Sequence, residues 1–448
     1  MRERNLRKQA LESGKTQSRK AREAFSTPSS SRANSAAPSP RGGSGVPSRN
    51  GSDDESEFSD ATQWSTNSID EMLSPAEIAV EETPEAWKAG LESRIEEICD
   101  RKRSSAEGRE QALLVFNTVL VRHYAADEVR SKRGELVAAL LKSVKGGQTE
   151  RETVLALKAL ALVLVTEPSD TVYEALQGPM KACINDGQHT AEKIGAIHAL
   201  GVVTFYGGAS EDETQEVMDF FLDIVSSDGA TIDENDNAEV VTAALEEWGF
   251  LATQLDDMEE ATEAAMDTFV DQLGSASVDV QVAAGDNIAL LFEKSYTEAE
   301  SDDEGPASDD ELDEAVRNGT RARMIKRYTV YRQQHQLLAT LSDLAKASSK
   351  RLSKRDRKQL HLSFADILRT VEKPTRGPRY STALDEEGRE MGSRLKVAVH
   401  GGGRMTIDRW WKLHRLNGLK RLLREGFLVH YEFNSVVFES LPVVVEDD

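Results

Sequence analysis

The segment 404–430 combines positive charge with aromatic rings. It carries seven arginines and lysines against two carboxylates, Asp408 and Glu425, and it contains two adjacent tryptophans. Arginine and lysine neutralise phosphates and release counterions, and aromatic rings stack on unpaired bases. These residue types are therefore those of a nucleic-acid-binding segment. Its basic and tryptophan residues are Arg404, Arg409, Trp410, Trp411, Lys412, Arg415, Lys420, Arg421 and Arg424.

A second basic cluster lies in the segment 353–372. Apolar residues follow the cluster at helical spacing, so we predict a helix that ends at Lys373–Pro374. In the later segment, Leu416, Leu419, Leu423 and Phe427 share one helix face, and we expect the neighbouring cations on the exposed side. We predict an RNA- or ribosome-binding site made of Lys354, Arg355, Arg357, Lys358, Arg409, Trp410, Trp411, Lys412, Arg415, Lys420, Arg421 and Arg424.

The sequence contains no complete catalytic or metal-binding motif. "GKT" at 14–16 lacks the first glycine of a phosphate-binding loop, and "DENDN" at 233–237 lacks the glycine and glutamate of a calcium loop. "HGGG" at 400–403 resembles an esterase oxyanion loop, but no GxSxG motif accompanies it. We therefore expect a protein that is not an enzyme, with no cofactor, no metal and no small-molecule substrate.

The charge of this 448-residue chain is divided unevenly along its length. The formal net charge is -23, yet residues 317–430 hold 27 basic and 10 acidic residues. Residues 211–314 hold 33 acidic residues and one lysine. Such an uneven distribution of charge gives information about binding partners and not about the fold. One expectation is that the acidic and basic regions contact each other and mask the basic one.

The composition also gives information about the cellular compartment. Two cysteines, Cys99 and Cys183, cannot form a disulfide framework, which indicates a reducing environment. The sequence shows neither a membrane-length apolar run nor a secretory signal. We expect a cytoplasmic monomer without membrane contact, and a nuclear location stays open.

Repetition predicts the fold. The blocks "ALLVFN", "ALKALA", "AIHALG", "ALEEWG" and "AGDNIA" begin at residues 112, 156, 196, 244 and 284, and each lies in the second helix of an expected helix pair. Paired helices that recur at about 40–47 residues are typical of HEAT or armadillo solenoids. We predict an all-α solenoid over residues 84–348, interrupted by a disordered acidic insertion near 298–314. The other expected parts are a disordered arm (1–83), a basic helix and linker (349–404) and a small helical unit (405–448).

The last hundred residues carry a family resemblance. "SKRDRKQLHLSFADILRTVE" and "IDRWWKLHRLNGLKRLLREGFLVHYEFNSVVFESLP" resemble two blocks of the interferon-related developmental regulator family. The matching positions in the second block are Trp410 or Trp411, Lys420, Leu423, Gly426, His430, Asn434 and Phe438.

The resemblance implies a non-enzymatic regulator with an armadillo-like fold. The family is associated with two activities, transcriptional co-regulation and binding to idle ribosomes through the C-terminal part. We therefore expect a ribosome- or RNA-binding regulator of translation that uses the solenoid as a scaffold. The alternative is a nuclear transcriptional co-regulator whose solenoid binds protein partners.

Overall fold

The structure is a computed structural model that describes residues 83–101, 104–298, 324–346, 352–384, 390–398, 404–442 and 445–446. The predicted arm lies outside this part of the chain except for Thr83, and the predicted insertion lies outside it except for Glu298. Within the described ranges, no helix has the length and apolar character needed to cross a membrane.

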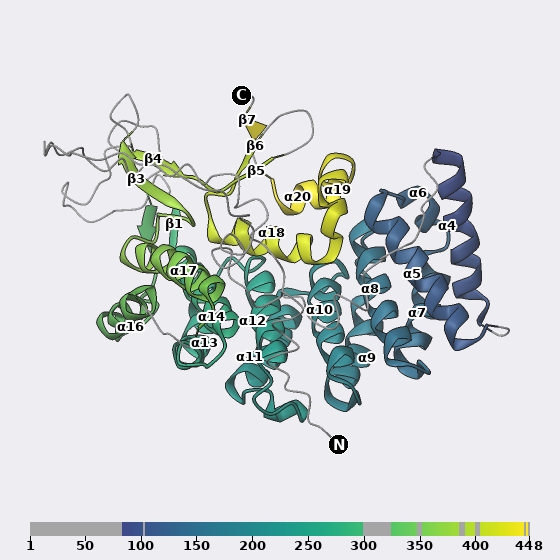
Figure 1. Ribbon diagram of the computed structural model, residues 1–448, viewed down its shortest axis with the longest axis horizontal. Coiled ribbons are helices and arrows are strands. Elements are labelled where there is room, and N and C mark those ends of the chain that lie inside the picture. The colour runs from purple at the N-terminus through teal and green to yellow at the C-terminus, as the bar shows by residue number, and fades with distance from the viewer. Residues whose placement is uncertain are drawn as a thin grey trace, which may run out of the picture. The chain divides into compact units, whose positions relative to one another are not determined.

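Paired helices make up most of the described chain (Figure 1). Each pair has an outer helix followed by an inner one, and the short α6 (Ala126–Arg130) and η2 (Ala230–Ile232) lie in connections. The pairs are α4 (Pro84–Cys99) with α5 (Ala106–Arg122), α7 (Arg133–Gly146) with α8 (Glu150–Thr166), α9 (Tyr173–Asp186) with α10 (Thr190–Tyr206), α11 (Glu211–Ser226) with α12 (Ala238–Ala252), α13 (Glu259–Gln272) with α14 (Val278–Lys294), and α16 (Gln334–Lys346) with α17 (Lys354–Glu372).

The inner helices form one continuous layer. Each packs on the next, in the order α5, α8, α10, α12, α14 and α17. The alanines that revealed the repeat all lie in inner helices and are buried, because a small side chain lets neighbouring helices approach. These alanines are Ala112, Ala156, Ala196, Ala244 and Ala284. The predicted helical solenoid is confirmed.

Helix pairing continues beyond the boundary expected at residue 348. The helix α17 packs on both α16 and α14, so it takes the inner position of a further pair. Its apolar stripe is buried at Leu360, Phe364 and Ile367, and Ile367 lies against Gly285 of α14. The segment that looked like a separate basic helix is therefore part of the layer.

Short strands occur in the described chain, although the sequence predicted an all-α fold. They form three antiparallel groups, β1–β2, β3–β4 and β5–β6–β7. The sequence has no alternating apolar pattern at these positions, because the formation of such short strands depends on packing against neighbouring elements. The antiparallel pairing of β1 with β2, in which Tyr296 lies opposite Lys326, joins the chain on the two sides of the acidic insertion. The strands are β1 (Tyr296–Glu298), β2 (Met324–Lys326), β3 (Tyr380–Leu384), β4 (Glu390–Ser393), β5 (Lys396–Ala398), β6 (Arg404–Thr406) and β7 (Val445–Glu446).

Two glycines mark the closest approaches within the inner layer. A Cβ atom at Gly201 would collide with the Glu247 carboxylate of the next inner helix. A Cβ atom at Gly249 would collide with the side chains of Asn287 and His414. Both glycines therefore lie where a helix approaches its neighbour.

We predict that Gly249→Leu lowers the free energy of unfolding by about 1–3 kcal/mol, because the added side chain overpacks this contact. Thermal melting followed by circular dichroism measures the loss. Gly90→Leu is the matched control, since a Cβ atom there meets nothing within 4 Å. An equal melting temperature for Gly249→Leu and wild type would contradict the packing described here.

Candidate nucleic-acid interface

The predicted helical unit at 405–448 lies along the inner layer (Figure 1). The helix α18 (Trp410–Leu423) packs on α14, α12 and α8, and η5 (Arg424–Gly426) packs on α5. The helices α19 (Phe427–Phe433) and α20 (Ser435–Ser440) follow, and α20 packs on α8. The C-terminal segment therefore runs back along the array, from its late repeats toward its first.

A buried carboxylate holds the start of α18. Glu293 of α14 accepts hydrogen bonds from the backbone N–H groups of Trp410, at 2.8 Å, and Trp411, at 3.1 Å. The first N–H groups of a helix have no hydrogen-bond partner within the helix, and negative charge is favoured at this end. The Trp410 ring is buried, and its indole N–H donates to Thr370 at 2.8 Å. Trp411 is half-buried, so the two adjacent tryptophans differ in their exposure.

Small and polar residues fit the rest of the segment to the array. A Cβ atom at Gly418 would crowd the Phe250 ring, and one at Gly426 would collide with the Val121 carbonyl. His430 Nε2 bonds to the Leu120 carbonyl at 2.8 Å. Asn434 Nδ2 donates to the Val165 carbonyl at 3.0 Å. Four positions of the family resemblance contact the array or hold its close approach, namely Trp410, Gly426, His430 and Asn434.

Arg421 faces the solenoid, so its predicted exposed position is wrong. Its guanidinium pairs with Glu246 at 2.6 Å and with Glu247, both on α12. Glu247 is buried and also meets His198 Nδ1 at 2.8 Å. Burial acts to lower the pKa of Arg421, but the two carboxylates outweigh it and raise that pKa. The prediction failed because α12 supplies one buried and one half-buried carboxylate, whose positions a sequence pattern does not reveal.

Arg415 is also turned toward the array. It donates to the Thr253 hydroxyl at 2.9 Å, to the Thr253 carbonyl at 3.0 Å and to the Ser440 carbonyl at 2.9 Å. Burial lowers the pKa of this guanidinium. Arg415 therefore ties α20 and α12 together through α18.

The other predicted residues of α18 and its borders are half-buried. Lys412 pairs with Asp408 at 2.6 Å, and the Lys420 ammonium lies 5.9 Å from the centre of the Phe427 ring. Burial lowers the pKa of Lys420. Arg409 precedes the first turn of α18, and Arg424 follows its last.

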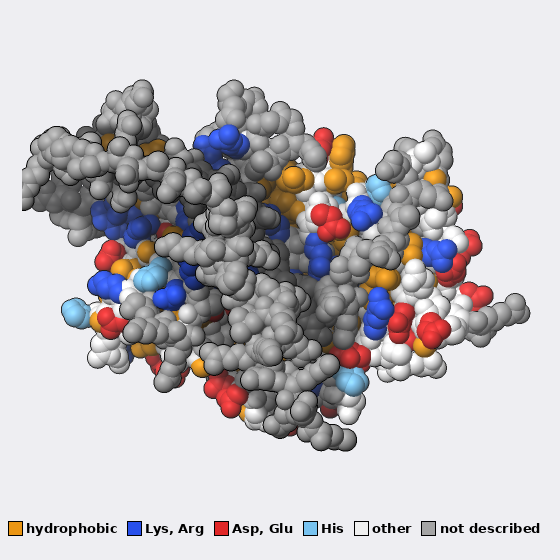
Figure 2. Space-filling model, viewed as in Figure 1, with side chains coloured by type: hydrophobic (Ala, Val, Ile, Leu, Met, Phe, Trp, Pro, Cys, Tyr) orange, Lys and Arg blue, Asp and Glu red, His pale blue; other side chains and the backbone are white. Residues whose placement is uncertain are grey.

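The first turns of α17 present most of the predicted exposed charge. Lys354, Arg355 and Lys358 are exposed, and Arg357 is half-buried. The Ser353 hydroxyl accepts from the Asp356 N–H at 3.1 Å and begins the helix. Figure 2 shows lysine and arginine side chains on the part of the surface formed by α16 and α17. The structure thus separates the predicted residues into an exposed group on α17 and a largely packed group on α18.

Exposed cations outside the predicted site lie on the strands. Arg394 and Lys396, which the sequence analysis did not single out, and Arg404, which it placed in the basic segment but not in the site, lie on or beside β4, β5 and β6. Lys396 and Arg404 belong to strands that pair with each other. Their signal in the sequence was the two-residue spacing of 394 and 396, which places both side chains on one side of an extended segment.

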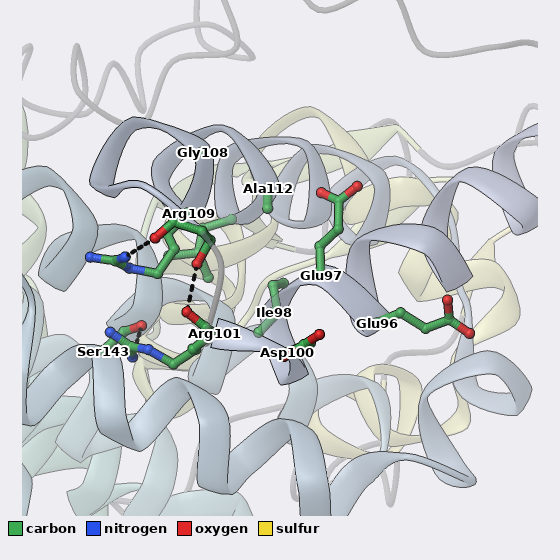
Figure 3. Close-up of a pocket in the computed structure, with 11 residues that line it drawn as sticks. Glu96, Glu97, Ile98, Asp100, Arg101, Gly108, Arg109, Ala112 and Ser143 are labelled. Carbon is green, nitrogen blue, oxygen red and sulfur yellow. Dashed lines mark hydrogen bonds between the residues drawn. The ribbon is translucent and has the colours of Figure 1, made fainter.

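A hollow of about 390 Å³ lies between α4, α5 and α7 (Figure 3). Its two arginines are already paired, because Arg101 and Arg109 contact the buried Glu152 carboxylate at 2.9 and 2.8 Å. Glu96, Glu97 and Asp100 complete its charged lining. Among the residues that the structure describes, no group of three or more His, Cys, Asp or Glu side chains is arranged to hold a metal ion.

Comparison with known proteins identifies the family. The family model described as interferon-related developmental regulator matches residues 55–372, which is more than half of the chain. This chain belongs to the interferon-related developmental regulator family. The family is described as one of regulators, and the membership that the sequence resemblance implied is thereby confirmed; the first of the two quoted blocks lies within the match, which ends at residue 372.

Relatives in fungi and mammals agree with this assignment. An uncharacterised protein of Schizosaccharomyces pombe is 29% identical over 347 residues, covering 77% of this chain and 72% of its own length. Human interferon-related developmental regulator 1 is 22% identical over 388 residues, covering 83% of this chain and 76% of its own. Mouse interferon-related developmental regulator 2 is 23% identical over 360 residues, covering 77% of this chain and 71% of its own.

We predict that Arg421→Ala lowers the free energy of unfolding by about 3–5 kcal/mol, because the buried Glu247 carboxylate loses its cationic partner. Denaturant unfolding measures the change. Arg122→Ala is the control, since its 4.0 Å pair with Glu425 is exposed and worth at most about 1 kcal/mol. Equal small losses for both variants would show that α18 does not pack as described.

We also predict a pH-dependent contribution from Glu293. Burial raises the pKa of this carboxyl from 4.5 to about 7, although the two tryptophan N–H groups oppose the rise. The folded state therefore keeps a proton that the unfolded state has lost, and stability falls as pH rises from about 4.5 to about 7. Unfolding free energies across this range should fall more steeply for wild type than for Glu293→Gln. A difference between the two that is independent of pH would contradict this, and the exposed Glu425→Gln serves as control.

Proposed function

We propose that this protein is a regulator that binds ribosomal or other RNA through its basic C-terminal region, with the first turns of α17 as the principal contact. The solenoid and its packed C-terminal segment serve as the scaffold. Translation is the process that such a regulator would control. The observation that carries the proposal is the cluster of exposed cations at the start of α17.

The position of these cations is unfavourable for the isolated helix. A helix N-terminus carries a partial positive charge, so cations in the first turn are repelled and carboxylates are preferred. Lys354, Arg355, Arg357 and Lys358 nevertheless occupy the first five positions of α17, with Asp356 as the single acid among them. A bound phosphate backbone would turn this repulsion into attraction, because both the cations and the helix terminus favour anions.

The α18 residues take a secondary place in the proposal. Arg415 and Arg421 already bind protein groups, and Trp410 is buried. The half-buried Arg409, Trp411, Lys412, Lys420 and Arg424 are proposed as additional contacts at the edge of the interface.

The outer helices favour a second candidate function. No lysine or arginine occurs in α11 or α13, and the carboxylates on these two helices are largely exposed. A surface of one sign attracts partners of the other. A nuclear scaffold that binds basic proteins through this face is therefore the alternative. The exposed carboxylates are Glu211, Asp212, Glu216, Asp219, Asp223, Glu259, Glu260, Glu263, Asp267 and Asp271.

Charge reversal tests the RNA proposal. We predict that changing Lys354, Arg355 and Lys358 together to Glu removes co-sedimentation with ribosomes in a sucrose gradient while helical content stays intact. Changing Lys132, Lys142 and Lys145 to Glu is the matched control, because these lysines are exposed on or beside α7 and the net charge changes equally. Ribonuclease treatment should release the wild-type protein.

Salt dependence provides an independent measure. If six or more phosphates are engaged across residues 351–430, affinity for RNA should fall by roughly 10³-fold or more between 50 and 200 mM salt. Co-sedimentation of the α17 variant equal to that of the α7 control would contradict the proposal. Migration with chromatin in place of ribosomes would favour the alternative.

A further inference from the structure

An exposed apolar surface lies on the last two helices. Phe433 at the end of α19 is 61% exposed, and Phe438 in α20 is 45% exposed. Leu428 and Val436 are half-buried on the same two helices, and we call these four side chains the α19–α20 patch. Figure 2 shows hydrophobic side chains gathered over these two helices. Exposed aromatic clusters of this kind mark contact surfaces.

The described chain begins at α4, which contacts the same end of α5 that α19 contacts. In the first turn of α4, the Trp87 ring stacks on His123 at the end of α5, with centroids 4.5 Å apart. The next residue, Tyr124, meets the His430 ring of α19 edge-on at 6.2 Å. His123 and Tyr124 at the end of α5 thus contact the start of α4 and α19, respectively.

That segment has the composition needed to cover an apolar surface. Residues 59–82 contain Trp64, Ile69, Met72, Leu73, Ile78 and Val80. Ile69, Met72 and Leu73 follow the spacing of one helix face. The segment has six carboxylates and no lysine or arginine, whereas Arg122 and Arg424 lie at the contact of α5 with η5 beside the patch. The family match begins at residue 55, so the segment belongs to the region that the family shares.

We propose that residues 64–80 pack on the α19–α20 patch, with Trp64, Ile69, Met72 and Leu73 against Phe433 and Phe438. Covalent connection favours this occupant over a second copy of the chain, because a short tether gives an effective concentration in the millimolar range. Reach is not limiting, since an extended chain spans about 3.3–3.6 Å per residue.

Limited proteolysis of the full chain with a glutamate-specific protease tests the contact. Cleavage after Glu71 and Glu77 should be slower in wild type than cleavage after Glu57, which lies outside the docked residues. Phe433→Asp should raise the rates at Glu71 and Glu77 by on the order of tenfold, because cleavage follows the population of the open form. The rate at Glu57 should not change.

Two further variants make the result specific. Leu384→Asp is the matched control, because Leu384 is an equally exposed apolar residue on β3, at 65%. It should leave all three rates unchanged. Leu73→Asp leaves the patch intact and should still speed cleavage at Glu77. Rates at Glu71 and Glu77 equal to that at Glu57 in wild type would overturn the proposal, as would protection that grows with protein concentration and so indicates a second copy.

Discussion

The buried carboxylate of Glu247 constrains the arrangement of the whole inner layer. It lies where α10, α12 and α18 meet, and the absence of a side chain at Gly201 makes room for it. A buried carboxylate is costly unless a cation and hydrogen-bond donors accompany it. Arg421 supplies the cation from a residue 174 positions later in the chain. The acidic middle and the basic end of the sequence are therefore joined inside the fold, and part of the expected contact between them is structural.

This pairing changes how the basic C-terminal region should be understood. Arginines 415 and 421 orient α18 on the solenoid, while Glu293 holds its first turn and Trp410 fills the space beside Thr370. Cations with these partners stabilise the protein itself. The proposed RNA contact therefore lies chiefly on α17, where Lys354, Arg355 and Lys358 are exposed in the first turns of the helix.

The repeated part of the fold could be predicted from the sequence, whereas the position of the C-terminal segment could not. The burial of Ala156 and Ala244 could be predicted from the repeat, because each inner helix packs against a similar helix at a fixed interval. The contact of Arg421 with α12 could not be predicted in this way, because a cation on the polar side of an amphipathic helix is expected to be solvent-exposed until its partner is known. Gly418, Gly426 and His430 were the available clues, because small or polar residues within an apolar helix often mark close contacts.

Hydrogen exchange of the α18 backbone amides, measured on the full chain, tests most directly whether the C-terminal segment is part of the solenoid. If Arg421, Glu293 and Trp410 anchor α18 as described, its central amides should be protected to a degree close to those of α12 and should exchange through the same opening. Arg421→Ala should lower protection in α18 more than in α5. Amides of α18 that exchange near the rate of an unfolded peptide, while those of α12 stay protected, would contradict this account.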